Sequence, residues 1–217
     1  MALTRKSRER TKADSSSISI PDGLPAFLND GHRPVAGGIR AEFVENLGPV
    51  STEDIPELRR RYASLIIQLD RLRPAIEAVD MFMRPKDEVW SIKETLGHLI
   101  DTDRDIWWPR IERLLTEESP QFEDVDHREI TLAHNWQLRP IEDILSQLVR
   151  ARWNYALKLD TFAPSDFCRS GEHALLGEIC ILRIVQILVA HDEYYLKKIQ
   201  AMIGSVASAP AGTGRPE

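Results

Sequence analysis

The pattern of apolar positions along the chain predicts helices rather than strands. Between residues 58 and 79 apolar side chains recur at steps of three and four, which places them on one buried face of a helix. Pro74 lacks an amide hydrogen and crowds the preceding turn, so we expect this helix to kink or end near Arg73. Alternation of period two is absent along the chain, so no sheet is expected. The stripe comprises Leu58, Tyr62, Leu65, Ile66, Leu69, Leu72, Ile76 and Val79.

A second helix is predicted to begin at Ser91, because Glu94 three residues later completes a capping box. Its stripe extends to Leu114, and Pro109 is expected to bend it. Asp103 interrupts this apolar stripe, so its carboxylate needs a partner such as an arginine or a backbone donor.

Two more helices complete the predicted core. One runs from about Pro140, a favoured first-turn residue, to Phe162, and another covers roughly residues 178–202 and is apolar nearly all round. Residues 117–139 lack a sustained period and are expected to form a long crossover with at most one short helix. Four helices of about twenty residues, each about 30 Å long, can enclose one core. The predicted fold is therefore an all-α four-helix bundle with a long connection between its second and third helices.

The two ends of the chain differ from this core in composition. The first twenty residues hold five bases and two acids and are followed by no apolar stretch, which indicates a solvated basic arm rather than a secretory signal. Residues 21–50 are rich in turn-forming residues, and we expect them to lie over the fold through Phe27, Leu28, Phe43 and Val44. The predicted organisation is a basic disordered arm and irregular segment over 1–50, the bundle over 51–204 and a flexible tail over 205–217.

Charge and composition exclude several classes of protein. The 34 acidic and 28 basic residues give a net charge of −6, which argues against a nucleic-acid binder that neutralises phosphates. No run of about 18 uninterrupted apolar residues is present, so no membrane span is expected. Cys168 and Cys180 cannot make a disulfide framework, which favours a reducing, cytoplasmic location. If the bundle pairs with itself, a symmetric homodimer is the default.

Two histidines and a tyrosine are candidates for a functional site. His191 lies among apolar and aromatic neighbours in the last predicted helix, where it is either a core histidine bonded to a carbonyl or tyrosine, or a ligand or base inside the bundle. His98 lies in a polar column away from the apolar stripe, which suits a surface residue as well as a groove-facing ligand. Tyr195 projects from the same face as His191; its phenol suits a hydrogen-bond donor or general acid better than a metal ligand.

The remaining histidines and cysteines carry weaker signals. His127 and His134 lie in the acidic crossover without a metal-ligand spacing, so we expect a solvated loop. His173 precedes the last helix, where bundle pockets open, and is a second-rank candidate. The two cysteines form no CxxC motif, and the nucleotide-binding, zinc-protease and hydrolase motifs are absent.

Two segments together carry a family resemblance. WSIKETLGHLIDTDRDIWW (90–108), followed much later by GEHALLGEICILRIVQILVAHDEYYLKKI (171–199), resembles the DinB-like/YfiT superfamily of bacterial four-helix bundles. The resemblance covers about residues 55–203. It implies a divalent metal of the nickel or zinc type held by three histidines, of which His98 and His191 match the first two positions. Tyr195 stands at the third, so the site is degenerate, and Asp101, Asp105, Asp192 or water would have to complete it.

The resemblance implies a divalent-metal-binding enzyme, either a thiol-dependent transferase or a metal-assisted hydrolase. The metal would generate a nucleophile from a bound thiol or water, and Tyr195 would donate a proton to the developing anion. Its substrate would be a low-molecular-weight thiol or another small molecule. The alternative is a bundle that has lost the metal and binds a small ligand or dimerises without catalysis.

Overall fold

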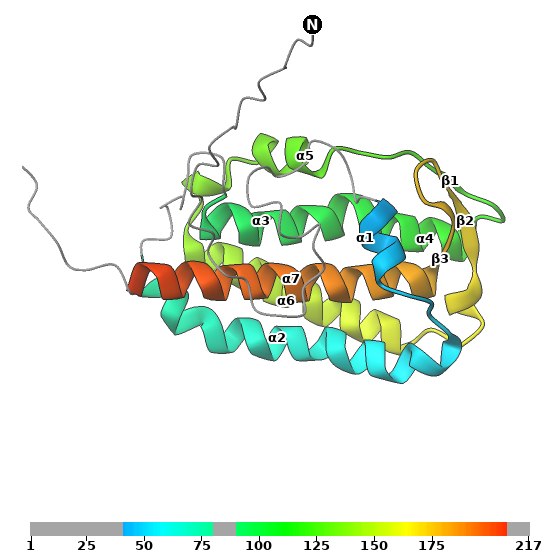
Figure 1. The fold of residues 1–217 in the computed structure, drawn as a ribbon, viewed down its shortest axis with the longest axis horizontal. Coiled ribbons are helices and arrows are strands. Elements are labelled where there is room, and N and C mark those ends of the chain that lie inside the picture. Colours follow the sequence, from blue (N-terminus) through cyan, green and yellow to red (C-terminus); the bar gives the residue numbers. More distant parts are fainter. Residues whose placement is uncertain (1–40, 80–89, 208–217) are drawn as a thin grey trace, which may run out of the picture.

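The computed structural model describes residues 41–79 and 90–207, in which four long helical segments pack side by side (Figure 1). This confirms the predicted bundle. The first twenty residues, Phe27, Leu28, His32 and the tail from residue 208 lie outside the described residues. The long segments are α2 (Ile55–Glu77), α3 (Ile92–Thr102) continued by a π-helical turn (Asp103–Trp107) and α4 (Trp108–Thr116), α6 (Ile141–Asp160) and α7 (Ile181–Ala207); the short helices are α1 (Ala41–Asn46) and α5 (His127–Ala133). Short 3₁₀ turns occupy Thr52–Asp54, Trp136–Leu138 and Asp166–Cys168. None of these described helices is both long and apolar enough to cross a membrane.

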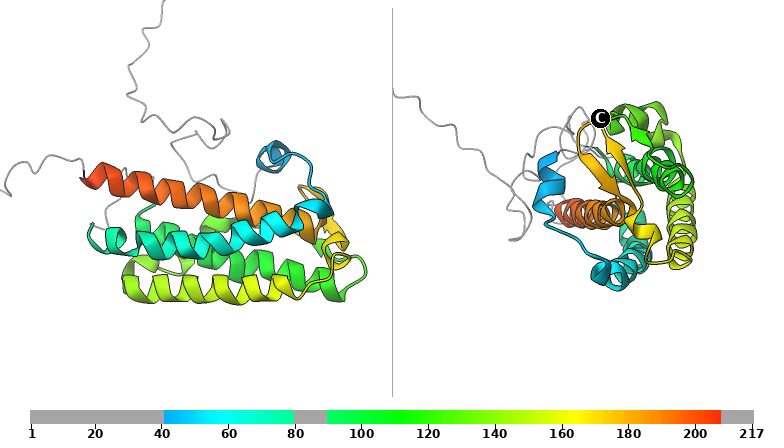
Figure 2. Two further views of the ribbon diagram at one scale, coloured as in Figure 1. Left: turned by 90° about the horizontal axis from the view of Figure 1, so that it is seen from below. Right: turned by 90° about the vertical axis from the view of Figure 1, so that its right-hand side faces the viewer.

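The expectation that the chain contains no sheet is wrong. Three short strands, β1 (Gln121–Phe122), β2 (Ser170–His173) and β3 (Gly177–Cys180), form a sheet at one end of the bundle (Figure 2). β1 pairs with β2 in parallel, and β2 pairs with β3 antiparallel. Strands of two to four residues are too short for an alternating pattern to stand out, which is why the sequence did not indicate them.

The helix boundaries test two of the sequence expectations. α2 does not end near Arg73 but continues through Pro74 to Glu77, and its last turn closes with a bond from the Ala78 amide to the Pro74 carbonyl at 3.2 Å. At the second helix the predicted capping box is confirmed: Ser91 Oγ accepts from the Glu94 amide at 3.2 Å, and the Glu94 carboxylate accepts from the Ser91 amide at 2.9 Å.

A π-helical turn precedes Pro109, the residue at which the sequence predicts a bend. Pro109 is the second residue of α4 and cannot donate a main-chain hydrogen bond to the turn before it. The wider π turn at Asp103–Trp107 lies at this point and changes the phase of the helix. The predicted second helix is thus one continuous segment with a local widening.

The crossover packs closely on α3 instead of forming a solvated loop. Every residue of α3 is buried. The Trp136 ring lies directly over Gly97, where a Cβ atom would come within 2.2 Å of the indole, so only glycine fits there. Trp136 Nε1 also donates to the Asp101 carboxylate at 2.6 Å. The face of α3 that seemed exposed from its polar residues is therefore covered by residues that come 30 to 40 positions later (Figure 1).

The segment before the bundle is attached to α7. Phe43 and Val44 are buried, as expected, but they belong to the short helix α1 rather than to irregular chain. Arg183 donates to the main-chain carbonyls of Val44 and Gly48, and Gln186 donates to that of Leu47 at 3.1 Å. The two polar residues that interrupt the apolar run of the last helix thus serve to hold residues 44–48 in place.

Candidate metal centre

The two candidate histidines meet inside the bundle. His98 comes from α3 and His191 from α7, and their Nε2 atoms lie 3.2 Å apart. Their exposed fractions are only 3% and 8%. Two imidazoles on one ion require a nitrogen–nitrogen distance of about 3–4.5 Å, because metal–nitrogen bonds are about 2.1 Å long. The separation therefore suits a shared ion, and the assignment of both residues as metal ligands stays a prediction.

A hydroxyl group on α5 determines which ring nitrogen of His98 carries the proton and which carries the free lone pair. Thr131 Oγ1 donates its only hydrogen to the His127 carbonyl at 3.0 Å, so towards His98 it acts as an acceptor. His98 Nδ1 lies 3.1 Å from this hydroxyl and must carry the proton. The lone pair of the neutral ring is then on Nε2, the atom that faces His191. A ring nitrogen fixed by a hydrogen bond on its far side is the usual arrangement behind a metal-binding histidine.

Burial keeps this histidine in its neutral form. Loss of solvation, reinforced by the nearby imidazoles of His191 and His127 and by the Lys198 ammonium, lowers the pKa of His98 well below its ordinary value. Protons therefore compete weakly for Nε2 at neutral pH. His191 Nδ1, in contrast, has no hydrogen-bond partner among the residues that the structure describes, and a carboxylate oxygen of Asp192 lies 3.6 Å away.

We expect Thr131→Val to weaken divalent-metal binding by about 10–100-fold, the usual cost of removing a hydrogen bond behind a metal ligand. Valine keeps the shape of threonine but removes the acceptor for His98 Nδ1–H. Thr131→Ser, which keeps the hydroxyl, is the matched control and should bind metal within a few-fold of the original protein. Metal titration by calorimetry measures both variants, and equal affinities for valine and serine would contradict the assigned proton position.

Aromatic rings enclose the histidine pair. The Trp90 ring centre lies 4.6 Å from that of His98, and the Tyr195 ring centre lies 4.8 Å from those of both His98 and His191. Burial raises the pKa of the Tyr195 hydroxyl above its ordinary value, so it remains a neutral phenol. A neutral phenol is a poor metal ligand but retains a proton to donate, and the catalytic assignment of Tyr195 stays a prediction.

The carboxylate of Asp192 is already bound elsewhere. Arg152 Nε lies 2.8 Å and Nη2 2.9 Å from its two oxygens, and the same guanidinium also contacts Asp103. Arg152 is fully buried, and its single positive charge is shared between the two acids. The expectation that Asp103 requires an arginine partner is confirmed, although the sequence did not indicate which arginine.

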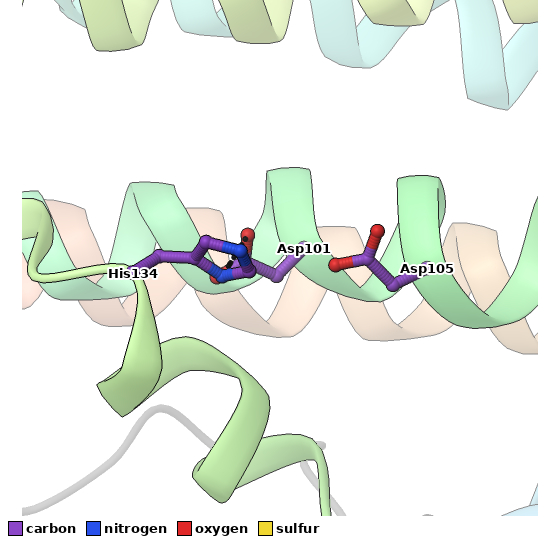
Figure 3. Close-up of side chains that lie close together, drawn as sticks. All are labelled: Asp101, Asp105 and His134. Carbon is purple, nitrogen blue, oxygen red and sulfur yellow. Dashed lines mark ion pairs between the residues drawn. The ribbon is translucent and has the colours of Figure 1, made fainter.

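Asp101 and Asp105 form a separate cluster with His134 on the outer side of α3 (Figure 3). One ligand atom from each of the three lies within 4.8 Å of the others, which makes this group a possible metal site in its own right. Arg104 Nη2, however, lies 2.9 Å from Asp101, 2.5 Å from Asp105 and 3.3 Å from His134 Nε2. The chain's own guanidinium therefore supplies the positive charge that these side chains attract.

The two remaining histidines differ from their sequence expectations. His127, expected in a solvated loop, is only 6% exposed, and its ring centre is 6.3 Å from that of His98. Burial lowers its pKa to about 3, so it is neutral. The sequence signal that we missed is Asp126, which marks the start of a helix at His127. Its carboxylate caps α5 by accepting from the Arg128 amide at 2.8 Å. His173 is buried too, but its Nδ1 accepts from the Leu175 amide at 3.1 Å and so stabilises a turn.

Comparisons with known proteins agree with this architecture. A family model for the DinB superfamily matches residues 64–197. A search of the curated proteins finds no match. Among solved structures, the chain is similar to YfiT from Bacillus subtilis, described as a probable metal-dependent hydrolase with an unusual four-helix bundle topology. The two share 17% sequence identity with a TM-score of 0.64, over 74% of this chain and 91% of that one, which shows a common fold. Because the family model spans more than half of its length, the chain belongs to the DinB superfamily.

Proposed function

We propose that this protein is a divalent-metal-dependent enzyme whose metal, of the nickel or zinc type, is bound by Nε2 of His98 and His191. The observation that carries the proposal is the 3.2 Å separation of these two atoms in a buried site. The position of the His98 proton supports it, since Thr131 directs the lone pair of Nε2 towards His191.

The donor set fits an ion that keeps open coordination positions. Two imidazoles are the protein ligands, and the nearby carboxylates are held by Arg152 and Arg104. A divalent metal supplies one kind of chemistry here, because it lowers the pKa of a bound water or thiol. The protonated Tyr195, whose ring lies beside both imidazoles, would donate a proton to an anion that develops on the substrate.

The reaction would be metal-assisted hydrolysis or a thiol-dependent transfer on a small molecule. The description of YfiT as a probable metal-dependent hydrolase favours the hydrolytic version. The alternative is a metal-free bundle that binds a small ligand or forms a dimer. Tyr195 at the third ligand position favours it, as does the apolar pair Trp153 and Leu157, which lie one turn apart on α6 with exposed fractions of 49% and 61%.

Metal content distinguishes these functions. The untagged protein should bind about one equivalent of zinc or nickel, and His98→Ala and His191→Ala should each weaken binding at least about 100-fold, or ~2.7 kcal/mol. His134→Ala is the control, because it removes the histidine of the Asp101 and Asp105 cluster instead. The proposal is wrong if no divalent metal binds, or if His134→Ala abolishes binding while His98→Ala does not.

A further inference from the structure

Lys198 lies on the same face of α7 as the proposed metal centre. His191, Tyr195 and Lys198 are spaced by four and three residues, so their side chains project in one direction. Lys198 Nζ lies 5.7 Å from the centre of the Tyr195 ring, which is itself 4.8 Å from the rings of His98 and His191. The ammonium is therefore separated from the histidine pair by one aromatic ring.

No carboxylate of the described residues forms an ion pair or hydrogen bond with Lys198. The acids nearest to the site have other partners, since Asp192 is bound by Arg152. On α7 itself, Glu193 is bound by Arg61 at 2.7 Å. Burial lowers the pKa of the Lys198 ammonium, and no anion in the described part of the chain offsets that cost. Among residues 41–79 and 90–207, the histidine site thus has a partly buried cation beside it with no carboxylate counter-ion.

The burial of the side chains changes along this face of α7. His98 and His191 are buried, whereas Tyr195 and Lys198 are both partly exposed. A small molecule that reaches the imidazoles along α7 would therefore pass the ammonium. A single ammonium balances one negative charge, which suits a carboxylate better than a dianionic phosphate.

We propose that Lys198 binds the carboxylate of an anionic small-molecule substrate whose reacting group lies at His98 and His191. The location of the reacting group at His98 and His191 rests on the proposed function, but carboxylate binding by Lys198 does not require a metal. Tyr195 would contact the body of the ligand between the two points, since its ring lies next to both.

The test compares hexanoate with 1-hexanol, which share a carbon chain but differ in charge. Ligand-observed NMR titrations of the full chain, with and without bound zinc, give the two dissociation constants. We expect hexanoate to bind at least about tenfold more tightly than hexanol, as a charge-assisted hydrogen bond allows. Lys198→Met should abolish this preference, and Lys198→Arg should retain it. Lys197→Met is the matched control, because Lys197 is the adjacent lysine on α7 but is exposed.

The two proposals can fail separately. The anion subsite is wrong if the original protein shows no preference for hexanoate, or if Lys198→Met keeps the preference while its melting temperature is unchanged. If the protein binds no zinc but still prefers hexanoate, and Lys198→Met removes this preference, the anion subsite is supported and the metal centre is contradicted. The metal-free titration therefore decides the subsite in every case.

Discussion

Replacing Arg152 by methionine is expected to lower the free energy of unfolding by about 3–5 kcal/mol, the usual cost of removing one partner from a buried ion pair. Methionine fills a similar volume but leaves the carboxylates of Asp103 and Asp192 buried without a counter-charge. Arg150→Met, an exposed position on the same helix, should change the stability by less than about 0.5 kcal/mol. Urea denaturation followed by circular dichroism measures both variants.

A second variant separates the charge effect from simple packing. If the cost arises from uncompensated carboxylates, adding Asp103→Asn and Asp192→Asn to Arg152→Met should recover a large part of the lost stability. A loss below about 1 kcal/mol for Arg152→Met alone would contradict the central role of this guanidinium.

Replacing Tyr195 by histidine is expected to tighten zinc or nickel binding by at least about tenfold, equivalent to ~1.4 kcal/mol. The Tyr195 ring already lies 4.8 Å from both histidine rings, and position 195 is four residues after His191 on one helical face. A third imidazole there would restore the set of three histidines that the family resemblance implies. Metal titration by calorimetry measures the gain.

Tyr194→His provides the control for this gain. Residue 194 is adjacent on α7, and its ring centre lies 5.0 Å from that of Tyr195, but replacing it leaves in place the Tyr195 ring, which is the one that lies 4.8 Å from both His98 and His191. It should leave metal affinity unchanged. Equal affinities for Tyr195→His and the original protein would mean that His98 and His191 do not share an ion, whatever their separation.

Periodicity predicted the long helices well because the information it uses is local. The stripes that include Leu65 and Leu148 are buried as expected, and the Ser91 capping box forms as the spacing indicated. The short strands were missed for the same reason, since two to four residues contain no complete repeat.

The site was harder to predict because its surroundings are distant in the sequence. From the helix wheel alone, His98 suited the surface as well as a groove, since the wheel cannot show that Trp136 and Thr131 cover the polar face of α3. The pairing of His98 with His191 was expected from the family resemblance rather than from spacing. Arg152 and Lys198 gave no local signal, because a lone base in an amphipathic helix usually points to solvent.

The hydrogen bond between Thr131 and His98 couples the packing of α5 to the state of the His98 and His191 imidazoles. Detachment of α5 would remove the acceptor from Nδ1, free the His98 proton to move to Nε2, and so withdraw the lone pair that faces His191. By reciprocity, an ion that requires that lone pair would favour the attached state of α5. Substitutions that loosen this attachment, such as those at Trp136 or Gly97, would then weaken binding of an ion by His98 and His191.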